Sequence, residues 1–405
     1  MISRQKIQSL YKLAAMGGGC GLLLLVRPLL YSIFARRRDL NAYASVDASA
    51  VVFIVYAVIC FFLAARELNR KEKTFGRDLF IHTPLLWLSL YTVLGMVSMI
   101  WSINLQLTGF RAFECMSMTM LMVAVVQNLF YHGGCKTVIQ WTMLYVTVDI
   151  IFSITRALSY TTNVMMLLQT SQMMATTFFY MALYQSRKRW WNYLILAMSV
   201  FSMSTVAYIG MSIGSISTFF GQKKYRVAVV LVFLILGTVI AVIGPYKFIK
   251  DTVFFDKQSI SIHETTGRDK IMKVVLEALE ERPSDGYGFF SGEPYLLRSK
   301  NLVAINGHNS LFSAAIGLGV PGIVLMALFF LTMMKTVFSR HIPPEYRASL
   351  IGCFCVSFLQ SMGNPGIGSR VFGGWMPTMF ATVLICGFYV YGKYYDEISE
   401  TNDEE

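Results

Sequence analysis

Residues 308–337 read HNSLFSAAIGLGVPGIVLMALFFLTMMKTV and contain one Lys or Arg side chain, Lys335, and no carboxylate. An α-helix needs about 20 mostly apolar residues to cross the hydrocarbon core of a bilayer. This stretch is long enough, and similar apolar runs recur along the chain. The pattern predicts an all-α, polytopic integral membrane protein.

The composition agrees with that fold class. Of the 405 residues, 55% are hydrophobic and 14% are charged, which is more apolar than a soluble domain can bury. The net charge of +12 comes from short clusters of Lys and Arg between the apolar runs. A nucleic-acid partner would instead require one basic face. Membrane lipid is therefore the expected surrounding, and no nucleic acid is expected as a partner.

Ten apolar runs are clear candidates for membrane spans: 13–34, 47–65, 79–100, 109–129, 138–158, 171–186, 226–248, 308–337, 347–362 and 375–392. Residues 191–222 are interpreted as two further short helices, because basic clusters at 187–189 and 223–226 flank them and cytoplasmic loops are enriched in Lys and Arg. About twelve spans result, with ten or eleven left open.

This topology divides the chain into four parts. Residues 1–248 hold helices 1 to 9, residues 249–306 form an extracytoplasmic loop, and residues 307–392 hold helices 10 to 12. Residues 393–405 form an acidic cytoplasmic tail, and residues 396–405 of it are expected to lack structure. Both termini are then cytoplasmic.

The outer loop contains one clear element, an amphipathic helix over 267–281. Its apolar residues recur at helical spacing and predict that one face lies on the membrane body; they are Ile271, Val274, Val275, Ala278 and Leu279. Thr266 and Asp269 form a capping box at its start. A flexible glycine-rich turn is expected at 285–288.

Arg268 and His308 are the leading candidates for a site. Arg268 falls in the first turn of the amphipathic helix, where a cation is unfavourable unless an anion such as phosphate lies beside it. The alternative is a surface arginine that pairs with Glu264 or Asp269. His308 stands at the membrane surface where the next span begins, and the alternative is that Asn309 or Ser310 caps this helix and His308 is merely interfacial.

Three further arginines, Arg111, Arg156 and Arg370, lie near the outer ends of spans. Charged groups at such depth usually line a cavity or form pairs. Several cations on one face suggest a polyanion such as a lipid diphosphate. The alternative pairs are Arg111 with Glu114 and Arg156 with Asp149.

The ordered motifs of the outer loop resemble those of O-antigen ligases and exopolysaccharide polymerases. The resemblance rests on Trp101-Ser102-Ile103-Asn104, Thr266-Gly267-Arg268, Glu281-Arg282-Pro283, Gly286-Tyr287-Gly288 and His308-Asn309-Ser310, followed by Gly317, Gly319 and Gly322. One departure is that residues 202–214 contain no arginine, where many relatives carry Ser-Arg-Gly.

The resemblance implies a GT-C-like fold and a glycosyltransferase that uses neither metal nor cofactor. Such enzymes transfer a glycan from undecaprenyl diphosphate to an acceptor hydroxyl on the outer face of the bacterial cytoplasmic membrane. Arg268 would contact the diphosphate and His308 would act in catalysis, while Arg111, Arg156, Arg370 and Asn309 would help to bind the diphosphate. Polymerisation of repeat units is favoured, and ligation to a lipid A core is the alternative.

Two other classes fit the residues less well. A polysaccharide or lipid transporter would not need a polar amphipathic helix followed by His-Asn at one surface. A metal-dependent lipid-sugar transferase needs clustered carboxylates. The first outer loop offers only Asp39 and Asp47, neither with an acidic neighbour, and the intramembrane carboxylates Glu114 and Asp149 are expected near opposite faces of the bilayer.

Overall fold

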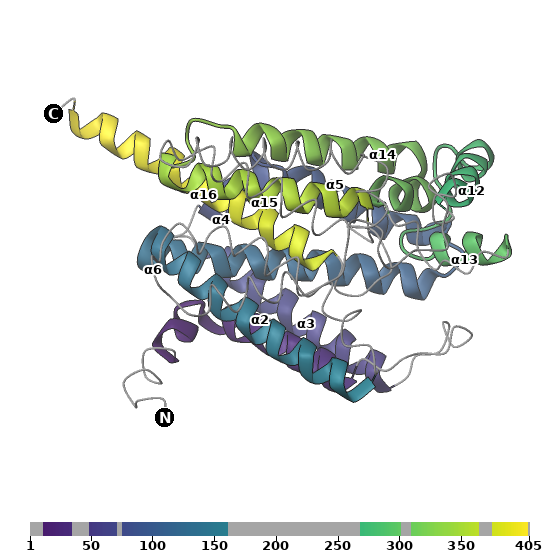
Figure 1. Ribbon diagram of the computed structural model, residues 1–405, viewed down its shortest axis with the longest axis horizontal. Helices are drawn as coiled ribbons and strands as arrows, with labels where there is room; N and C mark the ends of the chain where they lie inside the picture. Colours follow the sequence, from purple (N-terminus) through teal and green to yellow (C-terminus); the bar gives the residue numbers. More distant parts are fainter. Residues whose placement is uncertain are drawn as a thin grey trace, which may run out of the picture.

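The computed structural model describes residues 11–34, 48–70, 75–160, 268–300, 309–363 and 375–403. In these residues every regular element is a helix, which confirms the all-α prediction for this part of the chain (Figure 1). The elements are α2 (Gly18–Phe34), α3 (Ala48–Leu68), α4 (Phe75–Ile81), α5 (Leu85–Val97), the 3-10 turn η1 (Ser98–Ile100), α6 (Leu105–Tyr160), α12 (Arg268–Glu281), α13 (Gly292–Ser299), α14 (Ser310–Val337), α15 (Pro344–Gly363) and α16 (Met376–Asp403).

Several of these helices are suited to a membrane. Three are long and apolar enough to cross one, within α3, α6 and α14, and α4 with α5 passes the same test as a bent pair. Their outward faces carry exposed apolar side chains such as Val51, Val55 and Ile59 on α3. Contact with lipid explains why these apolar side chains lie on the outward faces of the helices. The chain is therefore a membrane protein, and the spans expected within 171–248 lie outside the described residues.

The apolar run expected to span the membrane over 79–100 is not one continuous helix. α4 ends at Ile81, α5 begins at Leu85, and the two helices are bent by 73°. Pro84 lies at the break. Proline explains the break, because it lacks an N–H and disfavours helical geometry in the residue before it. The Thr83 hydroxyl donates to the Leu79 carbonyl and accepts from the Leu85 N–H, so it satisfies groups that the break releases.

α6 contains both spans expected at 109–129 and 138–158. Gly134 interrupts it with φ 62° and ψ −161°, a conformation that is open to glycine and strained for other residues. Figure 1 shows α6 turning back at this point into two arms. Both arms extend further than the apolar runs alone predict.

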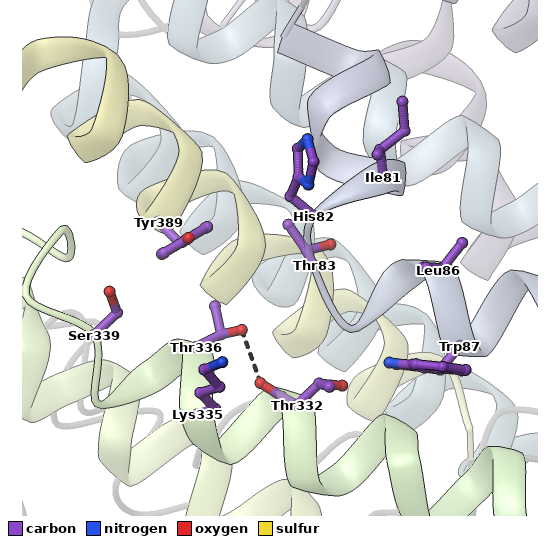
Figure 2. Close-up of a pocket in the computed structure, with 10 residues that line it drawn as sticks. All are labelled: Ile81, His82, Thr83, Leu86, Trp87, Thr332, Lys335, Thr336, Ser339 and Tyr389. Atoms are coloured by element: carbon purple, nitrogen blue, oxygen red, sulfur yellow. Dashed lines mark hydrogen bonds between the residues drawn. The ribbon is translucent and has the colours of Figure 1, made fainter. Parts of the chain in front are cut away.

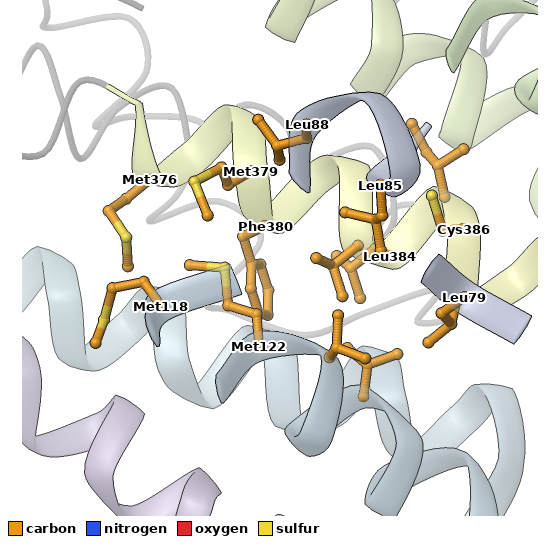
Figure 3. Close-up of a cluster of buried hydrophobic side chains, with 14 of the residues drawn as sticks. Leu79, Leu85, Leu88, Met118, Met122, Met376, Met379, Phe380, Leu384 and Cys386 are labelled. Atoms are coloured by element: carbon orange, nitrogen blue, oxygen red, sulfur yellow. The ribbon is translucent and has the colours of Figure 1, made fainter. Parts of the chain in front are cut away.

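The core lies where α16 packs on α6 and on the α4–α5 bend. Figure 3 shows the side chains that meet there: Leu79, Leu85, Leu88, Met118, Met122, Met376, Met379, Phe380, Leu384 and Cys386. Inside a membrane such contacts stabilise through close packing, because lipid tails are as apolar as the side chains themselves. Methionine suits this interface because its unbranched side chain fills irregular gaps.

The expectation that residues 396–405 lack structure is wrong for residues 396–403. α16 continues past residue 392 and ends at Asp403. Once a helix is nucleated, each added residue contributes a backbone hydrogen bond, so a buried helix can extend into a polar segment.

Candidate functional site

α14 is broken one third of the way along. Gly319 has φ 65° and ψ −152°, and Pro321 follows inside the helix. Pro321 has no N–H to offer the Gly317 carbonyl, which is four residues earlier. The turn at Gly319 likewise separates the Val320 N–H from the Ile316 carbonyl. Main-chain groups at 316–320 therefore need other partners.

Those partners come from residues 283–291, which we call the glycine loop. Each contact is a main-chain hydrogen bond between the loop and the break in α14: Tyr287 N–H to Ile316 O at 2.9 Å, Gly288 N–H to Gly317 O at 2.9 Å, and Val320 N–H to Pro283 O at 2.8 Å. The loop thus replaces hydrogen bonds that an unbroken helix would make internally.

The two backbones are too close for side chains to intervene. A Cβ atom at Gly286 would lie 2.7 Å from the Gly317 carbonyl carbon, and one at Gly319 would lie 2.5 Å from the Pro283 oxygen. Glycine is required at both positions for this reason and also because both have a positive φ. The turn expected at 285–288 is present, but it is not the free, flexible turn that we expected, because its main chain is hydrogen-bonded to α14.

The Trp101–Asn104 motif packs on the same loop. The Trp101 indole N–H donates to the Asp285 carbonyl at 2.7 Å across a separation of 184 residues. The Ile103 N–H reaches the Tyr287 carbonyl at 3.4 Å, while the Asn104 side chain accepts the Leu107 N–H at 3.0 Å and caps α6. Two motifs that are distant in the sequence form one unit.

A cluster of three hydroxyl groups strengthens this contact. Ser102 Oγ lies 2.7 Å from Thr108 Oγ1 and 2.8 Å from Ser291 Oγ, and the latter two are 2.9 Å apart. Thr108 also donates to the Phe289 carbonyl at 2.9 Å. Sequence reasoning missed Thr108 and Ser291, because isolated hydroxyl residues carry no recognisable pattern.

Phe289 and Phe290 anchor the loop in the helix bundle. The Phe289 ring meets Tyr91 of α5 edge to face at 5.4 Å, and its N–H donates to Ser98 Oγ at 3.1 Å. Phe290 has φ 60° and is the one non-glycine residue in the described parts of the chain with a positive φ. Such backbone strain persists only where surrounding contacts enforce it.

α12 presents its apolar face to α13 and α14. Ile271, Val274, Val275 and Ala278 are each at most 6% exposed, as the helical spacing of apolar residues in the sequence indicates. They pack with residues that include Leu297 of α13 and Ile316 of α14. Arg268 is the first residue of α12, and its side chain lies outside what the structure describes.

Glu293 of α13 is a buried carboxylate that sequence reasoning did not single out. It is 1% exposed, and its Oε1 accepts a hydrogen bond from Ser313 Oγ at 2.7 Å. Ser313 lies in the first turn of α14, where the helix dipole favours a negative charge. The bond fixes α13 to the start of α14.

Tyr287 connects the glycine loop to the end of α12. Its hydroxyl donates to the Glu281 carboxylate, and the Arg282 guanidinium lies over its ring at 4.8 Å. Burial, together with the Glu281 carboxylate, raises the pKa of Tyr287 to about 12. The phenol therefore stays protonated and keeps this hydrogen bond over the physiological range.

Arg111 pairs with Glu114, which confirms the ion-pair alternative. Its Nη1 lies 2.7 Å from Glu114 Oε2, with side-chain exposures of 15% and 6%. Arg111 follows Thr108 of the hydroxyl cluster by three residues, a rise of about 4.5 Å along α6. A role in diphosphate binding remains a prediction.

Arg156 lies in the second arm of α6. It is 22 residues after Gly134, and Arg111 is 23 residues before it, so each stands roughly 33 Å along its own arm from the turn. Both arginines are therefore far from the turn, although the side chain of Arg156 is not described.

Asn309 is the N-cap of α14, as one of the alternatives predicts. Its side-chain oxygen accepts the Leu311 N–H at 2.8 Å, and its amide nitrogen donates to the Met362 carbonyl at 3.2 Å. His308 precedes it in the chain, and both His308 and Arg370 lie outside the described residues. In the residues that were placed, no three His, Cys, Asp or Glu side chains group as metal ligands do.

Comparison with known proteins agrees with this site. No curated protein matches the chain. A family model described as O-antigen ligase matches residues 192–327, a segment that includes α12, the glycine loop, α13 and the break in α14. Arg268, His308 and Asn309 fall within the match, whereas Arg111, Arg156 and Arg370 fall outside it. Residues 192–327 are therefore similar to the O-antigen ligase family, which supports the resemblance to O-antigen ligases and polymerases found in the sequence.

Proposed function

We propose that this protein is a membrane glycosyltransferase that transfers a glycan from undecaprenyl diphosphate to an acceptor hydroxyl and so polymerises polysaccharide repeat units. The observation that carries the proposal is the O-antigen ligase match, because its residues build α12, the glycine loop and the start of α14. Main-chain hydrogen bonds join the glycine loop to α14 and to Ile103, the Trp101 indole N–H joins the loop to the Trp101–Asn104 motif, and apolar side chains pack α12 on α14. Helices and loops that are fixed to one another in this way can hold reacting groups in the geometry that the reaction needs.

The reaction needs charge stabilisation and one proton transfer. The acceptor oxygen forms a bond to the anomeric carbon, the bond from that carbon to the diphosphate oxygen breaks, and the diphosphate departs with the electron pair. We assign the acceptor proton to His308 as general base, and the developing diphosphate charge to Arg268 at the N-terminus of α12. No metal or cofactor is part of this proposal.

We assign supporting contacts with the diphosphate to Arg111, Arg156, Arg370 and Asn309. Arg111 forms an ion pair with Glu114, and a guanidinium has five N–H donors to share between several partners. Residues 202–214 contain no arginine, so the charge that relatives place there either comes from one of these three arginines or is not supplied in this chain.

The acceptor distinguishes polymerase from ligase. Purified protein would be incubated with lipid-linked repeat units alone, and the products separated by glycan length. We expect a ladder of longer glycans. Products that form only after a lipid A core is added would instead identify a ligase, and absence of transfer with either acceptor would contradict the proposal.

The proposal also places residues 249–306 outside the cytoplasm. The exposed Lys273 on α12 and the exposed Lys136 next to the α6 turn are suitable labelling positions. In intact cells, an impermeant maleimide should label Lys273→Cys and leave Lys136→Cys unlabelled until the cells are opened. Labelling of both cysteines in intact cells would contradict the topology. Ser291 is unsuitable for this purpose, because it is 4% exposed.

A further inference from the structure

A cavity of about 380 Å³ lies beside the α4–α5 bend, away from the glycine loop. Its walls come from this bend, from the last turns of α14 and from α16 (Figure 2). The lining residues are Ile81, His82, Thr83, Leu86, Trp87, Thr332, Lys335, Thr336, Ser339 and Tyr389. Lys335 is 16 residues beyond Gly319 in α14, or roughly 24 Å along the helix.

The charge of the lining favours an anion. Lys335 supplies an ammonium group and His82 an imidazole N–H, and none of the residues that line the cavity is acidic. Figure 2 shows Lys335 beside Thr332 and Thr336 on α14, with His82 and Thr83 on the opposite side. A phosphate group placed between the two walls would find donors on each.

The threonine hydroxyls that line the cavity also restrict which groups the ligand can carry. Thr332 donates to the Leu328 carbonyl at 2.6 Å and Thr336 donates to the Thr332 carbonyl at 2.8 Å, while Thr83 donates to Leu79. Since the proton of each hydroxyl is used in a hydrogen bond to a main-chain carbonyl, these hydroxyls can only accept hydrogen bonds from a ligand. The matching ligand carries hydroxyl donors in addition to its phosphate.

An apolar surface continues from the cavity along α5. Leu86 lines the cavity, and Leu90, Val93 and Val97 extend the same exposed face of the helix at helical spacing. Trp87 stands at the cavity edge, and tryptophan is enriched where hydrocarbon meets headgroups. A ligand that follows this surface has an anionic head and apolar tails.

We propose that the cavity binds the headgroup of an anionic glycerophospholipid, phosphatidylglycerol in particular, with its acyl chains along α5. The phosphate contacts Lys335 and His82, and the glycerol hydroxyls donate to the threonines. Basic pockets between membrane helices recognise anionic headgroups in this way. Occupation holds the α4–α5 bend against α14. This site is independent of the transfer reaction, so either proposal can fail alone.

The test uses purified, delipidated full-length protein in detergent. Thermal unfolding would be followed while dioleoyl phosphatidylglycerol is titrated, with dioleoyl phosphatidylethanolamine and dioleoyl phosphatidylcholine in parallel. We expect phosphatidylglycerol to raise the unfolding temperature at the lowest concentration. Equal effects of the three lipids would overturn the proposal, as would an equal effect of inorganic phosphate or glycerol phosphate, which would indicate a soluble anion.

Variants of single residues test whether phosphatidylglycerol raises the unfolding temperature by binding in this cavity. Lys335→Gln should weaken the phosphatidylglycerol response about tenfold or more, because a charge-assisted hydrogen bond is lost. Lys136→Gln is the matched control, since Lys136 is exposed and does not line the cavity. His82→Gln provides the same comparison if Lys335→Gln does not fold. A response that survives in the cavity variant, or that falls equally in the control, would place the lipid elsewhere.

Discussion

Gly134 and Gly319 have almost the same backbone conformation but different surroundings. Their torsions are φ 62°, ψ −161° and φ 65°, ψ −152°. A Cβ atom at Gly134 would have the Tyr391 hydroxyl as its nearest neighbour, at 3.4 Å, which is ordinary contact. At Gly319 it would lie 2.5 Å from the Pro283 oxygen. Gly134 is needed for a turn, whereas Gly319 is needed for a turn and for the docking of the glycine loop.

The turn at Gly134 only connects two arms of one helix, whereas the turn at Gly319 also docks the glycine loop. At Gly134 the chain turns between two arms of α6, and apolar side chains of both arms belong to one buried cluster. At Gly319 the released main-chain groups accept and donate hydrogen bonds to a segment about 30 residues earlier in the chain. The candidate site is thus positioned by backbone contacts, which depend on glycine at a few positions more than on the identity of the surrounding side chains.

The largest effect is expected from alanine at these two glycines. Both variants carry the strain of a positive φ, about 1–2 kcal/mol, and Gly319→Ala adds an overlap with the Pro283 backbone that costs about 1–3 kcal/mol more. Thermal unfolding in detergent should therefore show a clearly larger loss for Gly319→Ala than for Gly134→Ala. Equal losses would mean that the loop moves aside freely.

The variant His308→Gln tests whether the reaction takes place at the start of α14, beside the docked glycine loop. His308→Gln should lower turnover by about 10²-fold or more while the unfolding temperature stays near that of the native protein. Gly134→Ala serves as the control, because folded molecules of this variant should turn over normally. If His308→Gln lost donor binding as severely as turnover, the histidine would be a phosphate ligand and not a base.

Arg268 tests the diphosphate contact. Arg268→Ala should lower activity roughly tenfold to hundredfold, because one charge-assisted contact is worth about 1.5–3 kcal/mol. Arg268→Lys should recover little, since an ammonium cannot address two phosphate oxygens in one plane. The measurement is initial transfer rate at equal amounts of folded protein. Normal activity in the alanine variant would leave Arg268 as a surface arginine.

The smallest effect is expected at Tyr287, which connects α12 to the glycine loop. Because its pKa is raised to about 12 in the folded protein, the protonated phenol stabilises the fold fully below pH of about 10. This contribution is lost as the pH rises from about 10 to 12. The stability difference between the native protein and Tyr287→Phe should therefore shrink over that range.

Tyr295→Phe is the matched control for this measurement. Tyr295 lies on α13 and is 53% exposed. Removing its hydroxyl should therefore leave the fall in stability between pH of about 10 and 12 unchanged. The same pH response in Tyr287→Phe and the native protein would show that another group titrates.

The sequence predicted features that depend on local periodicity. The buried face of α12 follows from apolar residues at helical spacing, and the cap at Asn309 follows from its place before an apolar span. The bend at Pro84 was missed because the apolar run continues across it, and hydropathy does not register the missing N–H. The ion pair of Arg111 with Glu114 was foreseen because residues three apart on a helix are neighbours.

By itself, then, the sequence determined that the chain forms apolar membrane helices and that one polar segment carries a basic residue at a helix start. Only the tertiary structure decided that residues 283–291 dock on the break in α14 and that Trp101, Ser102 and Thr108 hold them there. The physical reason is that these contacts are made largely by main-chain groups and small hydroxyls. Every residue carries the same main chain, so the sequence does not show which distant backbone will satisfy it.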